Sequence, residues 1–285
     1  MKLLKVTFFE KYLFAWLRDV FIPLGIINCL YLVVQYRKWK YYQIFLIFLL
    51  LGLVNNSLTI AKAPTAALFL SIAAFIFIKS KRISLKYVII SVATIFSFPY
   101  LVIHLVTPPE FRAPSNLLNS LFLRVFVVPA EALYQYFEVF PSKHDFLIGK
   151  GSKLFSWLHH EGLFNAANYV AKIWWNDPTT TGNANANYLG TFWADFGWYG
   201  VIFSTILIGY IIHLFYWKLV VVAKYKKNMT YVSISSISVM MMSFTFISGN
   251  FTTILLTRGL LIMFLFVTLI QQIERKYETQ DLYIN

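Results

Sequence analysis

The chain has 285 residues, of which 59 % are hydrophobic, 19 % are aromatic and only 13 % are charged. Ordinary globular proteins are roughly 45–50 % apolar and about 25 % charged, so this composition excludes most soluble folds as well as intrinsic disorder. It predicts an all-α, polytopic integral membrane protein that forms a single membrane domain over residues 1–285.

The formal net charge is +13, from 25 Lys and Arg against 12 Asp and Glu. In a soluble protein such an excess indicates nucleic acid, but here the basic residues cluster in short gaps between apolar runs, where they determine membrane topology. We therefore predict no nucleic-acid partner. Cys29 is the only cysteine, so an intrachain disulfide is excluded.

The N-terminus begins like a signal peptide, but Glu10, Lys11, Arg18 and Asp19 interrupt its apolar run. Because no small-residue cleavage site follows, we predict no cleavage. A membrane-crossing helix needs about 20 mostly apolar residues. Seven runs are candidates in chain order: 20–35, 42–54, 64–78, 87–106, 199–223, 231–247 and 254–270.

Lys and Arg in alternating gaps predict the orientation of these spans, because basic loops stay on the cytoplasmic side. The basic residues of the gaps after spans one, three and five are Arg37, Lys38, Lys40, Lys79, Lys81, Arg82, Lys86, Lys224, Lys226 and Lys227. This pattern places segment 107–198 outside and the C-terminus inside. An odd number of spans then puts the basic N-terminus outside. Either residues 6–17 form a further membrane-associated helix, or helices that once preceded them are missing.

Segment 107–198 is the main departure from a plain helix bundle. Loops of this length are usually functional or disordered, and its many aromatic residues exclude disorder. Residues 117–128 are strongly apolar and are expected to lie in the membrane interface or to re-enter the membrane. Pro129 is expected to kink or break that helix.

The familiar nucleotide-binding, redox and metalloprotease motifs are absent from the sequence. His159 and His160 are adjacent, and adjacent residues do not share a helix face, so with Glu161 they lack the spacing of metal ligands. We predict no metal and no cofactor.

Three asparagines in the outer segment, Asn183, Asn185 and Asn187, alternate with alanine. In an extended chain all three amides face one side, and amides that both donate and accept hydrogen bonds suit sugar hydroxyls. The equally weighted alternative is a polar turn that caps the next helix. Asp195 follows, either as a simple helix cap or as a general base or sugar ligand.

At this point the sequence resembles the Wzy-type O-antigen and capsule repeat-unit polymerases. In that family an Asn-rich outer loop runs into an Asp-Phe-Gly-x-x-Gly turn and a membrane helix, a pattern that residues 185–202 reproduce. Two further stretches match: 124–130 followed by 134–149, and 58–64. The resemblance covers roughly residues 45–270. Because these polymerases usually have more membrane helices ahead of this region, a shortened N-terminus is expected.

The resemblance implies a glycosyltransferase of the bacterial plasma membrane, active at its outer face. Such enzymes move a growing glycan from undecaprenyl diphosphate to the end of an incoming lipid-linked oligosaccharide repeat unit. For this chain the resemblance implies as partners the lipid-linked substrate, membrane lipid, and the flippase and chain-length regulator proteins of O-antigen, capsule or exopolysaccharide synthesis.

This chemistry needs cations at the diphosphate leaving group, and Arg suits diphosphate through its bidentate fork. The candidates are Arg124 and Arg258, both in apolar surroundings where an Arg is a functional hypothesis, and then Arg112 and Lys62. Arg258 is alternatively an arginine that snorkels to the interface. A base for the acceptor hydroxyl is sought among His144, His159, His160, Asp145, Glu161 and Asp195.

Two other functions compete with the polymerase. The first is a transporter or flippase of lipid-linked glycans, which usually has internal repeats and a substrate site near the bilayer midplane. This chain has no obvious repeat, and its polar residues gather in one outer segment, which favours an outer-face enzyme. The second is a truncated remnant of a longer polymerase.

Overall fold

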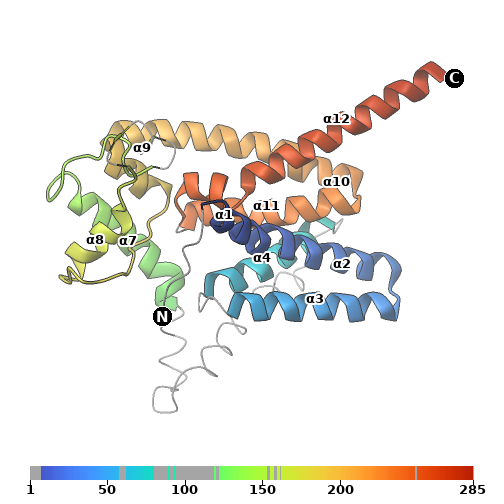
Figure 1. Ribbon diagram of the computed structural model, residues 1–285, viewed down its shortest axis with the longest axis horizontal. Coiled ribbons are helices and arrows are strands. Elements are labelled where there is room, and N and C mark those ends of the chain that lie inside the picture. The colour runs from blue at the N-terminus through green and yellow to red at the C-terminus, as the bar shows by residue number, and fades with distance from the viewer. Residues whose placement is uncertain are drawn as a thin grey trace, which may run out of the picture. The chain divides into compact units, whose positions relative to one another are not determined.

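The chain is all-helical over the residues that the computed structural model describes, which are 8–57, 62–79, 89, 93, 119, 122–152, 155, 156, 159, 160, 162–247 and 249–284. The α-helices, labelled in Figure 1, are α1 (Phe8–Trp16), α2 (Ile22–Tyr36), α3 (Trp39–Ser57), α4 (Lys62–Lys79), α7 (Val128–Val139), α8 (Ala166–Trp174), α9 (Tyr188–Phe215), α10 (Val222–Lys226), α11 (Met229–Ile247) and α12 (Leu260–Ile284). Short π-helical turns adjoin several of them: η1 (Leu17–Phe21), η3 (Leu123–Val127), η5 (Tyr216–Val221) and η6 (Thr253–Thr257).

Three helical segments in this part of the chain are long and apolar enough to cross a bilayer: Leu13–Tyr36, Tyr188–Lys226 and Met229–Ile247. Two shorter apolar helices cover Ala66–Lys79 and Leu260–Glu274. These segments confirm the predicted all-α, membrane-type architecture. The predicted span 87–106 lies outside the described residues, apart from two isolated positions, and residues 8–16, whose role the sequence left open, are helical.

The chain divides into two compact units, each described here by itself. The first contains Met1–Ile95, His213–Met241 and Leu255–Asn285, and the second contains Phe96–Ile212 and Met242–Ile254. The predicted outer segment 107–198 therefore belongs to the second unit, together with the end of α11 and the residues that follow it.

In the first unit, α2 and α3 are joined by residues 37 and 38 and pack side by side (Figure 1). Pro23 follows η1 directly, inside the continuous helical segment Leu13–Tyr36, so its missing N–H leaves one helical hydrogen bond unmade beside that π-helical turn. Arg37 ends the helix in the left-handed conformation, and its N–H donates to the Val33 carbonyl at 2.9 Å. This closure satisfies one of the carbonyls that a helix end leaves free.

Lysines from two of the predicted cytoplasmic gaps meet at one end of the first unit. The Lys79 ammonium lies 3.8 Å from the centre of the Tyr31 ring, and the Tyr31 hydroxyl donates to the Lys227 carbonyl at 2.7 Å. Lys224 lies over the Phe77 ring in the same way. The gaps that topology rules assign to the same side of the membrane are thus together in space.

The core of the second unit is built by α7, α8, the beginning of α9 and the loops between them. Its buried residues are Tyr136, Val139, Phe140, Leu147, Ala166, Val170, Ala171, Ala184, Ala186, Trp193 and Ala194. The Trp193 indole N–H donates to the Phe140 carbonyl at 2.8 Å. This bond fixes the beginning of α9 against the end of α7, the two helices that flank the site described next.

Candidate functional site

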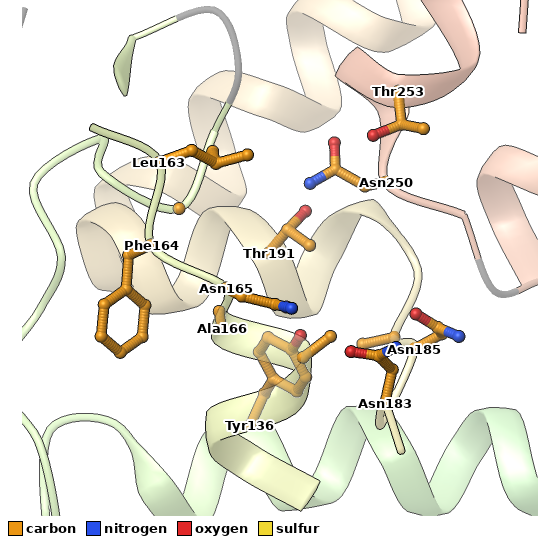
Figure 2. A pocket seen from close by; sticks show the side chains of 13 residues that line it. Tyr136, Leu163, Phe164, Asn165, Ala166, Asn183, Asn185, Thr191, Asn250 and Thr253 are labelled. Atoms are coloured by element: carbon orange, nitrogen blue, oxygen red, sulfur yellow. The ribbon is translucent and has the colours of Figure 1, made fainter. Parts of the chain in front are cut away.

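The second unit contains a pocket with a volume of about 340 Å³ (Figure 2), near the lower end of the range for small-molecule sites. Its walls come from α7, the start of α8, the extended segment before α9, α9 itself and the chain after α11. The lining residues are Tyr136, Gly151, Leu163, Phe164, Asn165, Ala166, Ala167, Asn183, Asn185, Ala186, Thr191, Asn250 and Thr253. None of these described lining residues has a charged side chain.

The Asn–Ala alternation places amides at the pocket and methyl groups in the core. Asn183 and Asn185 are exposed and line the pocket, whereas Ala184 and Ala186, which follow them, are buried, and Ala186 also contributes to the lining. The segment is extended, and the Ala184 N–H donates to the Ala167 carbonyl at 2.9 Å. The sequence prediction of amides on a single face therefore holds for these two residues.

Asn187 takes the alternative role that the sequence allowed, because it caps the helix that follows. Its side-chain oxygen accepts from the Leu189 N–H at 3.0 Å, and its amide nitrogen donates to the Phe246 carbonyl at 3.3 Å. It does not line the pocket. One five-residue segment thus contains both an exposed pair of amides at the pocket and a helix cap.

Asp195 lies behind the pocket wall instead of facing the pocket. It is only 1 % exposed, and its Oδ1 accepts from the N–H of Gly151, which does line the pocket, at 2.8 Å. The adjoining loop is held to the same stretch of α9, since the Leu147 and Ile148 N–H groups donate to the Ala194 and Asp195 carbonyls. Its Oδ2 is buried and has no hydrogen-bond partner among the described residues. Asp195 therefore positions the wall of the pocket.

Tyr136 contributes an aromatic wall and a hydroxyl that stays protonated. The residue is 1 % exposed, and burial raises the pKa of its phenol well above the usual value, with the nearby Asp195 charge adding to the shift. A neutral phenol both donates and accepts hydrogen bonds. Together with the Asn and Thr side chains, it gives the pocket the chemistry of a site for uncharged hydroxyl groups.

The Asp-Phe-Gly-Trp-Tyr-Gly run is a helix break. Gly197 has φ 59° and ψ −142° inside α9, a conformation that a side chain would strain. A Cβ on Gly200 would lie 2.3 Å from the Phe192 carbonyl oxygen, so the two parts of α9 approach closely across the break. The backbone conformation at the break and this close approach therefore explain why both positions of the run are glycine.

His144, predicted as a candidate base, sits in an aromatic cluster outside the pocket lining. Its ring lies 5.0–5.6 Å from the ring centres of Phe140, Phe164 and Tyr169. Its Nδ1 lies 2.6 Å from the Asp145 carbonyl oxygen. His159 is likewise tied to the backbone, with Nε2 2.7 Å from the Ile148 carbonyl oxygen.

The predicted cations are divided between the two units. Arg258 belongs to the first unit, where its guanidinium lies 3.2 Å from the carboxylate of Asp19, the anionic partner that its apolar surroundings require. Lys62 begins α4 in the same unit, and Arg124 lies in η3 in the second. Arg112 lies outside the described residues.

The pocket also contains residues that sequence reasoning missed, chiefly Tyr136, Asn165, Thr191, Asn250 and Thr253. Asn165 caps α8 by accepting from the Asn168 N–H at 3.2 Å, and an Asn before a helix is a recognisable signal. Asn250 follows α11, far along the chain, and nothing in the sequence around it indicated a place in the same pocket as Asn183.

Across the described part of the chain, no three His, Cys, Asp or Glu side chains are grouped as metal ligands would be. Comparisons with models of protein families, with curated proteins and with solved structures find no match for this chain.

Proposed function

We propose that this chain is a membrane glycosyltransferase of the Wzy-type repeat-unit polymerases. The observation that carries the proposal is the uncharged, amide- and hydroxyl-lined pocket of the second unit, because its walls include the Asn-rich segment on which the family resemblance rests. In this proposal the chain crosses the bacterial plasma membrane seven times, and the pocket opens on the outer side.

In the proposed reaction the pocket holds a sugar of the incoming lipid-linked repeat unit. Asn183 and Asn185 donate to and accept from its hydroxyls. A hydroxyl oxygen of this acceptor attacks the anomeric carbon of the growing glycan, and the bond from that carbon to the undecaprenyl diphosphate breaks. The hydroxyl proton passes to a base from outside the uncharged pocket lining, for which His144, itself outside that lining, is the candidate, since Asp195 is buried behind the pocket wall. The diphosphate leaves with its charge stabilised by arginine.

The proposal is tested by deleting the gene and separating the surface polysaccharide by length on a gel. We expect a ladder of chain lengths to collapse to a single repeat unit, because transfer between lipid carriers has stopped. Loss of all surface glycan, with lipid-linked units accumulating on the inner leaflet, would instead indicate a flippase.

The pocket is tested by complementing the deletion with Asn183→Ala and Asn185→Ala. We expect each variant to shorten the glycan, since one lost hydrogen bond to a bound sugar costs about 0.5–1.5 kcal/mol, or roughly two- to tenfold in turnover at low substrate. Thr181→Ala is the control, because Thr181 is exposed on the same segment and outside the pocket. Equal chain lengths from all three variants, at equal protein levels, would remove the pocket from the reaction.

A further inference from the structure

A single carboxylate stands directly behind the wall of the pocket in the second unit. Gly151 lines the pocket, and Oδ1 of Asp195 accepts its backbone N–H at 2.8 Å. A Cβ at Gly151 would itself lie 2.8 Å from Oδ1, so a residue with a side chain would push the carboxylate away from the wall. One layer of backbone without a side chain therefore separates this charge from the space in which a ligand binds.

The charge of Asp195 has no counter-ion in the described part of the chain. The residue is 1 % exposed, it forms no ion pair with a described Lys, Arg or His, and its Oδ2 has no hydrogen-bond partner there. A buried and unpaired charge acts over a longer range than a charge in water. Burial, and secondly this charge, raise the pKa of Tyr136, which lines the pocket, so the field of Asp195 reaches the lining.

The pocket offers no group that pairs with an anion. Its polar side chains are amides and hydroxyls, and none of the described lining residues is charged. Figure 2 shows the side chains of Asn165, Thr191 and Asn250, which come from three different segments, around one space. An acidic group that entered this space would lose its water without gaining a cation, and it would also be repelled by Asp195.

We infer that the pocket selects a sugar without an acidic group, and that Asp195 is the residue that enforces this selection. The inference rests on the proposed function and deepens it, because it names the class of sugar: a neutral or amino sugar, in place of a uronic acid or a phosphorylated sugar. The net charge of the whole chain, +13, by itself predicts a preference for acidic sugars. The local and the global charge thus predict opposite results.

The test compares three methyl glycosides that differ only in their charge at carbon 6: a hexose with a hydroxymethyl group, its uronic acid with a carboxylate, and its 6-amino-6-deoxy form with an ammonium group. Each is offered in the gluco, galacto and manno configurations to the purified full-length chain in phosphatidylcholine nanodiscs. Affinities are ranked by competition in ligand-observed NMR at about pH 8, where histidine is neutral and an alkyl amine is protonated.

The expected preference follows from the distance between the two charges. Two like unit charges about 7 Å apart, at an effective dielectric constant of about 20–40, repel by the equivalent of roughly seven- to fiftyfold in affinity. We therefore expect the wild type to bind the neutral sugar about tenfold more tightly than the uronic acid. The amino sugar should bind at least as tightly as the neutral one, because Asp195 attracts it.

Asp195→Asn removes the charge and keeps the shape, since its amide oxygen can still accept the Gly151 N–H. We expect affinity for the uronic acid to rise about fivefold or more, affinity for the amino sugar to fall by a similar factor, and affinity for the neutral sugar to stay within about twofold. Misfolding would weaken all three together, so changes of opposite sign report the charge itself. Glu138→Gln is the matched control, because Glu138 is exposed on α7, where water screens its charge.

Several outcomes overturn the inference. They are equal or tighter binding of the uronic acid by the wild type, no binding by any sugar of the panel, and the same ranking in Asp195→Asn as in the wild type. If deletion of the gene collapses the glycan ladder while the uronic acid binds best, the selection fails and the polymerase stands. If the neutral sugar is preferred but deletion leaves the ladder intact, the sugar site stands and the polymerase fails.

Discussion

Trp193→Phe tests how the second unit holds its pocket together. Trp193 is 9 % exposed, and its indole N–H donates to the Phe140 carbonyl at 2.8 Å. Phenylalanine cannot donate, and leaving a buried carbonyl unpaired costs about 1–3 kcal/mol. The smaller ring also gives up buried area and contacts with Phe137 and Phe146, for about 1 kcal/mol more. The unpaired carbonyl and the lost buried area together should destabilise the contact between α7 and α9 by about 2–4 kcal/mol.

The stability of this contact can be measured on the full chain in detergent by hydrogen exchange with mass-spectrometric detection. The Leu147 and Ile148 amides donate to carbonyls beside Trp193, so their exchange reports local opening. A loss of 2 kcal/mol corresponds to roughly thirtyfold faster exchange. Trp39→Phe is the control, because Trp39 begins α3 in the first unit and is 75 % exposed. Exchange rates within about threefold of the wild type for Trp193→Phe would refute the reasoning.

Three further predictions concern topology, metal and the helix break. Cysteines introduced singly at Ser142 and Thr180, in a Cys29→Ser background, should react with an impermeant thiol reagent in intact cells lacking an outer barrier; protection of both would invert the topology. Polymerisation should survive EDTA, because guanidinium groups alone can stabilise the leaving diphosphate, and loss of activity restored by added divalent ion would contradict this. Gly200→Ala should lower the melting temperature, since its Cβ would lie 2.3 Å from the Phe192 carbonyl oxygen and overpacking costs about 1–3 kcal/mol; an unchanged melting temperature would disprove that close approach.

The features that follow from local sequence were predictable. The apolar run predicted at 231–247 corresponds to α11 at Met229–Ile247, because a sustained hydrophobic run is itself the signal for such a helix. The two-residue period of the Asn–Ala segment likewise predicted amides on one side, since side chains alternate in an extended chain. In both cases the physical cause lies within the segment.

The partners of individual residues were not predictable. Arg258 was expected to need an anion, but its partner Asp19 lies at the other end of the chain. Asp195 was expected to face a ligand or to cap a helix, and instead its carboxylate receives the Gly151 N–H. These contacts depend on how distant segments fold together, and neither hydrophobic period nor motif spacing carries that information.

In the extended segment before α9, alanines that maintain the core alternate with exposed amides that line the pocket. Ala184 and Ala186 are buried in the core of the second unit, so larger side chains there would disrupt packing. Asn183 and Asn185 project from the other face and are exposed, so replacing them changes the pocket without altering the core. Under the proposed function, a segment of this kind would allow the recognised sugar to change by point substitution while the protein remains folded. A library randomised at positions 183 and 185 alone is therefore the natural starting point for altering specificity.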